Sequence, residues 1–362
     1  MHLKIINQTI IDKNMNDKKS VADYYLQLID ERRLQLVNNP EHAEWRYRTL
    51  IKHITAQRHL KDFAPNACWD DVSQEWLQGM ERHLVDKGYS NSYVKRLLRD
   101  VKTFLNWAYH TGLYSNASFR EFHAKYRDET GKMISGNKFA LSLEELKLLQ
   151  ELDLQKRRKL QRTRDMFLFC CYTGLRFSDA MKLRWSDIGD SCIKIVTQKT
   201  NQLIEIPITK QMKLILERYE RKDSSDRVFP QTTNMSYNSQ LQEVGRIAGL
   251  DEDWIKVRQC GNTVSIVRMK KYQCLSSHVA RRTFSTIALQ QGMPMEVIMS
   301  ITGHTTVKML QGYMKINQGM KRRYMERFAI DSDLESLAHQ IMQLTEEKMA
   351  QLFTMIFSYR RA

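Results

Sequence analysis

Six polar residues in the second half of the chain have side chains suited to breaking a phosphodiester bond with a tyrosine. They lie in the segments TGLRFSDA, TQKTN, SHVARRTF and TGHTTVKMLQGYMKI, and they are Arg176, Lys199, His278, Arg281, His304 and Tyr313. A tyrosine hydroxyl can attack phosphorus, arginines can bind phosphate oxygens, and histidine or lysine can move protons. The chemistry that this set could perform is phosphoryl transfer through a covalent phosphotyrosine.

The arginines carry much of this interpretation. Transfer at a phosphodiester puts negative charge on nonbridging oxygens, and fixed cationic donors stabilise that charge. Arg176 and Arg281 are the expected clamp, because a planar guanidinium matches two oxygens whereas lysine offers a point charge. His278 and Arg281 are three positions apart on an expected helix, so both side chains face one phosphate. Arg282 follows directly, and periodicity alone does not decide between the two arginines.

Each member of the set also has an ordinary structural interpretation. Arg176 at a helix end and Lys199 in a turn could simply face solvent, and His278 could be a helix N-terminal residue. His304 could be a capping histidine and Tyr313 a core residue, since an unassisted tyrosine, with a pKa of about 10, is protonated at neutral pH. The catalytic interpretation is favoured by joint occurrence, in order, within TGLR, HxxR and GH followed nine positions later by tyrosine.

These contexts resemble the tyrosine recombinase (phage integrase) family over residues 141–330, and the helical segment ahead of them resembles it more loosely. The resemblance implies that His278 assists proton transfer from Tyr313 and that His304 hydrogen-bonds the phosphate. Lys199 would protonate the departing 5′ oxygen, leaving a 3′-phosphotyrosine link. The family requires neither metal nor nucleotide cofactor, which fits a sequence without a carboxylate cluster or a P-loop. The chain departs from the common HxLRHTFA and LGH by reading HVARRTFS and TGH.

The charge of the chain favours a polyanionic partner. The net charge is +16, and the excess is uneven: residues 1–127 carry 20 basic and 15 acidic side chains, whereas residues 141–330 carry 32 and 19. Neutralising phosphates releases counterions, so a basic domain binds nucleic acid in a salt-dependent way. A merely soluble basic protein is the alternative.

Other compositional signals exclude several classes. The six cysteines show no CxxC pair and no regular spacing, so neither a disulfide framework nor a metal site is indicated. No apolar run approaches the length of a membrane span, and the N-terminal apolar run is too short for a signal peptide. We expect a cytoplasmic, bacterial nucleoid-associated protein.

Apolar periodicity predicts a mainly α-helical fold with small antiparallel β-hairpins, arranged by analogy with the family as a two-domain DNA clamp. A leader is expected at 1–16 and a helical core-DNA-binding (SAM-like) domain at 17–127. A linker at 128–140, a mixed α/β catalytic domain at 141–330 and a C-terminal helix at 331–362 complete the chain.

Four helices are expected in the first domain. The second should bury Trp45, Leu50 and Ile51, and the fourth should begin at Ser90. The polar face of the fourth helix carries Lys95, Arg96, Arg99 and Lys102. A basic helix face is usually only solvated, so these residues, with Arg282, are no more than candidate DNA contacts.

The second domain should open with a capping box at Ser142. A helix ending at Gly174 then places Arg176 just past its end, and two alternating strands place Lys199 in the turn between them. A second hairpin is expected at 255–269, with its role open.

Two further helices should complete the set of six. One runs from His278 to about Gln291 with Ser276 and Ser277 as its caps, and one is capped by Thr305 or Thr306 and carries Tyr313. An approximate apolar stripe in 331–362 is compatible with a helix folded on its own domain or docked on a neighbouring protomer.

The leading hypothesis is a site-specific recombinase or integrase of a mobile element, acting by integration, excision or inversion. The family analogy implies double-stranded DNA with inverted-repeat core sites, a tetramer holding a Holliday junction, and accessory DNA-bending proteins. A topoisomerase-like nicking and closing enzyme and a non-catalytic DNA-binding regulator are the alternatives. The DNA target is not readable, because it depends on base contacts and DNA shape.

Overall fold

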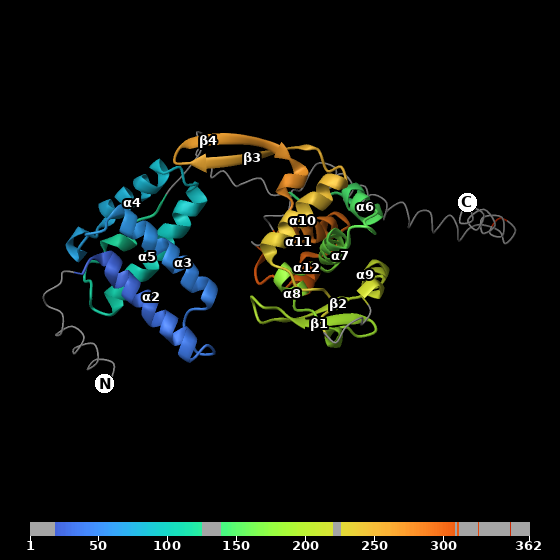
Figure 1. Ribbon diagram of the computed structural model, residues 1–362, viewed down its shortest axis with the longest axis horizontal. Coiled ribbons are helices and arrows are strands. Elements are labelled where there is room, and N and C mark those ends of the chain that lie inside the picture. The colour runs from blue at the N-terminus through green and yellow to red at the C-terminus, as the bar shows by residue number, and fades with distance from the viewer. Residues whose placement is uncertain are drawn as a thin grey trace. The chain divides into compact units, whose positions relative to one another are not determined.

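The computed structural model describes residues 19–124, 139–219 and 226–307, together with Leu310, Met325 and Lys348. Contacts divide the chain into two compact units, Met1–Asn137 with Ile255–Met269, and Lys138–Trp254 with Lys270–Ala362 (Figure 1). The expected leader, Tyr313 and nearly all of the expected C-terminal helix lie outside the described residues. No helix in the described part of the chain is long and apolar enough to cross a membrane.

The first unit is a helical bundle. It contains α2 (Val21–Asn38), α3 (Tyr47–Phe63), η1 (Trp69–Asp71), α4 (Gln74–Asp86), α5 (Asn91–His110) and η2 (Ser118–Arg120). Ser20 caps α2 through a capping box with Asp23. The prediction that Ile51 is buried is wrong, because α3 turns Leu50 into the core and leaves Ile51 44% exposed. The predicted start of the fourth helix is confirmed, since Ser90 is the N-cap of α5.

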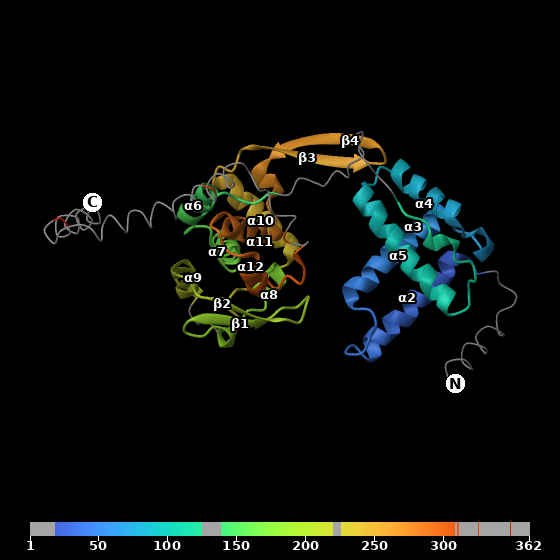
Figure 2. The ribbon, with the colours of Figure 1, turned by 180° about the vertical axis from the view of Figure 1, so that it is seen from behind.

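The second hairpin is attached to this helical unit. Its strands are β3 (Asp253–Cys260) and β4 (Thr263–Lys270), and the turn between them begins at Gly261. The Asn91 side chain at the start of α5 donates to the Gly261 carbonyl at 2.7 Å and accepts from the Gly261 N–H at 2.6 Å. Figure 2 shows this end of the hairpin beside α4 and α5. The sequence places 255–269 in the second domain, whereas the contacts place it in the first unit. An isolated two-stranded ribbon is only marginally stable, and the hydrogen bonds to Asn91 give this one support.

The second unit is mainly helical with one further hairpin. Its elements are α6 (Leu143–Glu151), α7 (Arg158–Thr173), α8 (Phe177–Ala180), η3 (Trp185–Asp187), β1 (Cys192–Val196), β2 (Leu203–Pro207), α9 (Lys210–Leu216), η4 (Glu217–Tyr219), α10 (Asn234–Ile247), η5 (Lys271–Cys274), α11 (Ser277–Gln290) and α12 (Met295–Thr302). The capping box predicted at Ser142 is present, and β1 and β2 pair antiparallel from Cys192↔Pro207 to Val196↔Leu203. The mainly helical fold with small antiparallel hairpins is confirmed.

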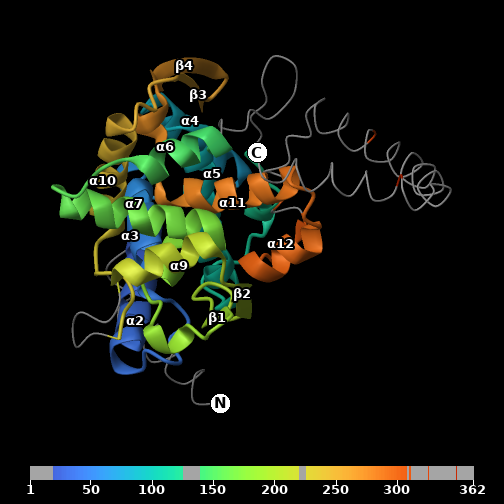
Figure 3. The same ribbon diagram turned by 90° about the vertical axis from the view of Figure 1, so that its right-hand side faces the viewer.

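The core of the second unit is built around α7, whose side chains from Met166 to Cys171 are all buried. Helices α10 and α11 pack against α7, and Figure 3 shows α7 and α11 side by side with α12 following α11. The apolar patterns above do not single out α9, α10 or α12. Helix α12 matters most for the site, because it ends directly before the GH motif.

Candidate active site

The loop after α7 positions the first arginine. Helix α7 ends at Gly174, whose φ of +68° is the left-handed conformation that glycine adopts without strain. The chain then turns, and Arg176 becomes the N-cap residue of α8. Arg176 Nη1 is buried, and among the described residues it has no hydrogen-bond acceptor; the nearest carboxylate oxygen, Asp179 Oδ2, is 3.8 Å away. Arg176 is thus buried beside a carboxylate that it does not reach by a hydrogen bond.

The second arginine lies against the end of this loop. Arg281, on α11, is 1% exposed and donates from Nη1 to the Gly174 carbonyl at 2.9 Å. Its Nη2 lies 3.1 Å from Nε2 of His304. His304 follows Gly303, whose φ of +64° ends α12. Segments far apart in sequence thus converge, and the predicted residues Arg281 and His304 are in direct contact.

His304 is held as a neutral imidazole. Burial is the main reason that its pKa falls from 6.5 to about 4, and the charges of nearby basic residues lower the pKa further. Those residues, in decreasing order of effect, are Arg281, Arg176, His278 and Lys199. The same electrostatics show that four other residues of the predicted set lie within interaction distance of His304.

Lys199 is placed by the β1–β2 turn. It is exposed, and the turn is fastened to α8 because the Gln198 N–H donates to Asp179 Oδ1 at 3.0 Å. The hairpin also packs on the GH motif: a Cβ on Gly303 would lie 3.4 Å from Ile204 Cγ2. Asp179 is therefore a site residue that the sequence analysis missed. Its position three residues after Arg176, in RFSD, was the available signal.

Of the two remaining residues of the predicted set, the structure describes His278 but not Tyr313. His278 is exposed in the first turn of α11, three residues before Arg281. The adjacent Arg282 turns elsewhere, and its Nη1 donates to the Phe139 carbonyl at 3.4 Å. The geometry thus puts Arg281, rather than Arg282, against His304. Tyr313 lies outside the described residues.

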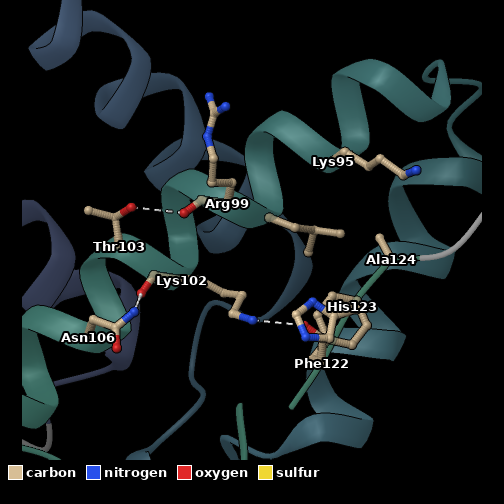
Figure 4. Close-up of a pocket in the computed structure, with 9 residues that line it drawn as sticks. Lys95, Arg99, Lys102, Thr103, Asn106, Phe122, His123 and Ala124 are labelled. Atoms are coloured by element: carbon tan, nitrogen blue, oxygen red, sulfur yellow. Dashed lines mark hydrogen bonds between the residues drawn. The ribbon is translucent and has the colours of Figure 1, made fainter. Parts of the chain in front are cut away.

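The basic face of α5 borders a surface hollow of about 380 Å³ in the first unit (Figure 4). Lys102 points into it, and its ammonium donates to the carbonyls of Phe122 at 2.8 Å and Arg120 at 3.1 Å. Burial lowers the pKa of Lys102. Lys102 therefore ties the end of the bundle to α5, whereas Arg99 extends away from the Phe122 side of the hollow.

Arg96 lies outside the lining of this hollow, and its guanidinium is over the ring of Tyr93, 4.7 Å from the centroid. Lys95 is half-buried on the hollow's rim, and Arg99 is exposed. The basic face thus divides into one lysine bonded to backbone carbonyls and three cations whose charged groups lie nearer the surface.

Comparison with known proteins gives the same assignment for both units. Residues 141–320 match the phage integrase family, and residues 20–126 match the phage integrase SAM-like domain. The tyrosine recombinase XerC-like protein of Caldanaerobacter subterraneus subsp. tengcongensis is 21% identical over 64% of this chain and 64% of its own length. Tyrosine recombinase XerD of Oceanobacillus iheyensis is 22% identical over 72% of this chain and 84% of its own length.

Two solved integrase structures have a similar fold. The Tn1549 transposon integrase in complex with a circular intermediate DNA superposes with a TM-score of 0.62 at 16% identity, covering 85% of this chain and 99% of that one. A lambda integrase dimer bound to a COC′ core site gives 0.59 at 16% identity, covering 80% and 93%.

The fold is therefore that of the two-domain integrases. The two matched models together span most of the chain, and the chain belongs to the tyrosine recombinase (phage integrase) family. Members of this family are site-specific DNA recombinases, and a phosphotyrosine intermediate is characteristic of them.

Proposed function

We propose that this protein cleaves and rejoins DNA at specific sites through a 3′-phosphotyrosine formed on Tyr313. The observation that carries the proposal is the convergence of Arg176, Arg281 and His304, with Lys199 on the adjoining turn. Two guanidiniums beside a neutral imidazole form a site for a phosphate with two nonbridging oxygens. Family membership supplies the nucleophile, which lies outside the described residues.

The proposed roles follow from side-chain chemistry and the family pattern. The Tyr313 oxygen attacks phosphorus as the bond to the 5′ oxygen breaks, and the two arginines bind the nonbridging oxygens. His278 takes the phenolic proton, and Lys199 gives a proton to the departing 5′ oxygen. Reversal by another 5′ hydroxyl rejoins the strand, so the bond energy is conserved.

Lys199 fits its role because its turn is anchored behind it while its side chain is exposed. The hydrogen bond from Gln198 to Asp179 fixes the backbone directly before Lys199. Asp179 also lies beside Arg176, so one buried carboxylate positions both the turn and the arginine loop. Through these two contacts Asp179 would hold Lys199, the proton donor, at a fixed position relative to Arg176.

The broader biological role extends this proposal. The substrate would be double-stranded DNA with inverted-repeat core sites, brought together by a tetramer that passes through a Holliday junction, with accessory DNA-bending proteins. The reaction would be integration, excision or inversion of a mobile element, at the bacterial nucleoid. The segment 331–362 would dock on a neighbouring protomer, so truncation after Ile330 should weaken assembly on DNA.

The cations on the basic face of α5 would contact the DNA backbone. Lys95, Arg96 and Arg99 are suited to phosphates because they lie at the surface of α5. Lys102 would contribute less directly, since its ammonium is already bonded to two carbonyls. Arg282 donates to the Phe139 carbonyl, so its main effect on DNA binding would be to hold the backbone at Phe139 in place.

Covalent capture on DNA tests the proposal. The protein is incubated with fragmented DNA from its source and denatured in detergent, and the DNA that stays attached is sequenced. Tyr313→Phe is the matched control, because it removes only the hydroxyl. We expect adducts at one or two inverted-repeat sites with the wild-type chain, and none with the variant at unchanged noncovalent affinity.

Other outcomes point to the alternatives. Adducts scattered without sequence focus would favour a topoisomerase-like enzyme. Salt-sensitive binding without any adduct would favour a DNA-binding regulator, and adducts that persist in Tyr313→Phe would refute the nucleophile assignment.

A further inference from the structure

Thr302 is a buried hydroxyl that the proposed chemistry does not use. It is the last residue of α12, it has no exposed surface, and it stands directly before the GH motif. Its Oγ1 lies 2.6 Å from the Ile298 carbonyl oxygen and 2.7 Å from Nδ1 of His304. A carbonyl oxygen only accepts, so the single hydroxyl proton of Thr302 goes to Ile298. Nδ1 of His304 must then carry a proton of its own and donate it to Thr302.

The contact on the opposite side of the His304 ring requires the same tautomer, with the proton on Nδ1. Nε2 of His304 lies 3.1 Å from Nη2 of Arg281, and a guanidinium has donors but no acceptor. Nε2 must therefore offer its lone pair. Both contacts select the neutral imidazole with its proton on Nδ1, and together they fix the ring plane between Thr302 and Arg281. In this arrangement the ring has no proton to donate to a phosphate, which differs from the hydrogen bond that the family resemblance implies for His304.

The methyl group of Thr302 has a separate contact. A Cβ built on Gly174 would lie 2.8 Å from Thr302 Cγ2, so this methyl fills the space that the glycine leaves open. The Gly174 carbonyl is the acceptor for Nη1 of Arg281. Because Thr302 is branched at Cβ, one rotamer places its methyl group against Gly174, whose carbonyl accepts from Arg281, and its hydroxyl against His304.

We propose that Thr302 is a positioning residue that fixes the tautomer and ring orientation of His304 and, through it, the direction of the Arg281 guanidinium. A leucine, the residue common before GH in the family, has no hydroxyl and cannot do this. The effect of Thr302 on catalysis rests on the proposed function, whereas its effect on the imidazole proton does not.

The experiment compares Thr302→Val, which keeps the branched shape without the hydroxyl, with Thr302→Ser, which keeps the hydroxyl without the methyl. The first readout is the ¹⁵N spectrum of the histidine rings, with His304→Gln used to assign the signal. We expect a protonated Nδ1 and an unprotonated Nε2 in the wild-type and serine proteins. The valine variant should lose the hydrogen-bonded Nδ1 proton signal. A wild-type ring protonated at Nε2 would overturn the proposal, whether or not the protein cleaves DNA.

The second readout is single-turnover formation of the covalent DNA adduct by each full-length variant. The outer hydrogen-bond partner of a metal-binding histidine is typically worth about 10-fold to 100-fold in activity, and we expect a loss of similar size for Thr302→Val, because it too removes the partner that orients the ring. Thr302→Ser should retain most of the wild-type rate. Equal losses in both variants would assign the effect to methyl packing and refute the positioning role. Absence of adducts in the wild-type protein would refute the proposed function instead, while leaving the spectrum to decide on Thr302.

Discussion

The Gly174 carbonyl accepts a hydrogen bond from Arg281. Replacing Gly174 by alanine should lower the free energy of unfolding of the second unit by about 2–5 kcal/mol. Alanine in the left-handed conformation, φ +68° here, costs about 1–2 kcal/mol. The new Cβ would lie 2.7 Å from Phe284 Cδ1 and 2.8 Å from Thr302 Cγ2, and such overpacking costs about 1–3 kcal/mol more. The two costs add, because the first arises from the backbone conformation of the alanine itself and the second from its steric overlap with Phe284 and Thr302.

Gly249→Ala is the matched control in the same unit. Gly249 has a φ of +74°, and a Cβ there would meet nothing within 4 Å, so only the backbone cost of about 1–2 kcal/mol applies. Native-state hydrogen exchange of the α7 amides in low urea measures both variants without requiring two-state unfolding of the whole chain. Equal destabilisation would show that Phe284 and Thr302 move aside freely, and would refute the idea of a rigid contact. Slower adduct formation by Gly174→Ala alone is also expected, because its carbonyl holds Arg281.

Two further predictions concern His304 and the β3–β4 hairpin. Because the pKa of His304 is about 4 in the folded protein and 6.5 ordinarily, the unfolded chain binds more protons between these values. The contribution of His304 to the free energy of unfolding is therefore full above about pH 6.5 and decreases as the pH falls toward 4. The urea midpoint should drop less on acidification in His304→Gln than in the wild-type protein. Parallel curves of midpoint against pH for the two proteins would contradict this. Asn91→Ala removes both hydrogen bonds to Gly261 and should speed exchange of the Gly261 amide. Asn91→Asp keeps the acceptor and should be intermediate, so an unchanged alanine variant would refute the docking.

The local signals in the sequence were strong enough to predict how Arg176 and Lys199 are presented. A glycine at the end of an apolar helix and two alternating strands around a polar turn are short-range patterns, and both elements formed as expected. The side of α11 that faces the site was harder to predict. Arg281 and Arg282 are adjacent, and the choice depends on Gly174 and Phe139, which are distant in sequence and supply the two carbonyl acceptors.

Long-range contacts also explain what the sequence analysis missed. Nothing local marks Asp179 as the acceptor for the Gln198 amide, because the bond spans 19 positions and needs the β1–β2 hairpin to fold back on α8. The attachment of 255–269 to the helical unit is less local still, since Asn91 and Gly261 are 170 positions apart. Patterns with a period of two or 3.6 residues identify elements, but they carry no information about which distant backbone an amide will meet.

The two acceptors that hold the Arg281 guanidinium are both uncharged groups. Arg281 is held by the neutral Gly174 carbonyl and by the lone pair of His304, neither of which cancels its charge. His304 avoids adding a charge of its own, because burial and the surrounding cations keep its pKa near 4. Neutral acceptors position the guanidinium without competing for it as a carboxylate would. If the proposed function holds, a phosphate bound here would meet a guanidinium of Arg281 that these two neutral acceptors have already oriented, which is the condition for strong stabilisation of a transition-state oxyanion.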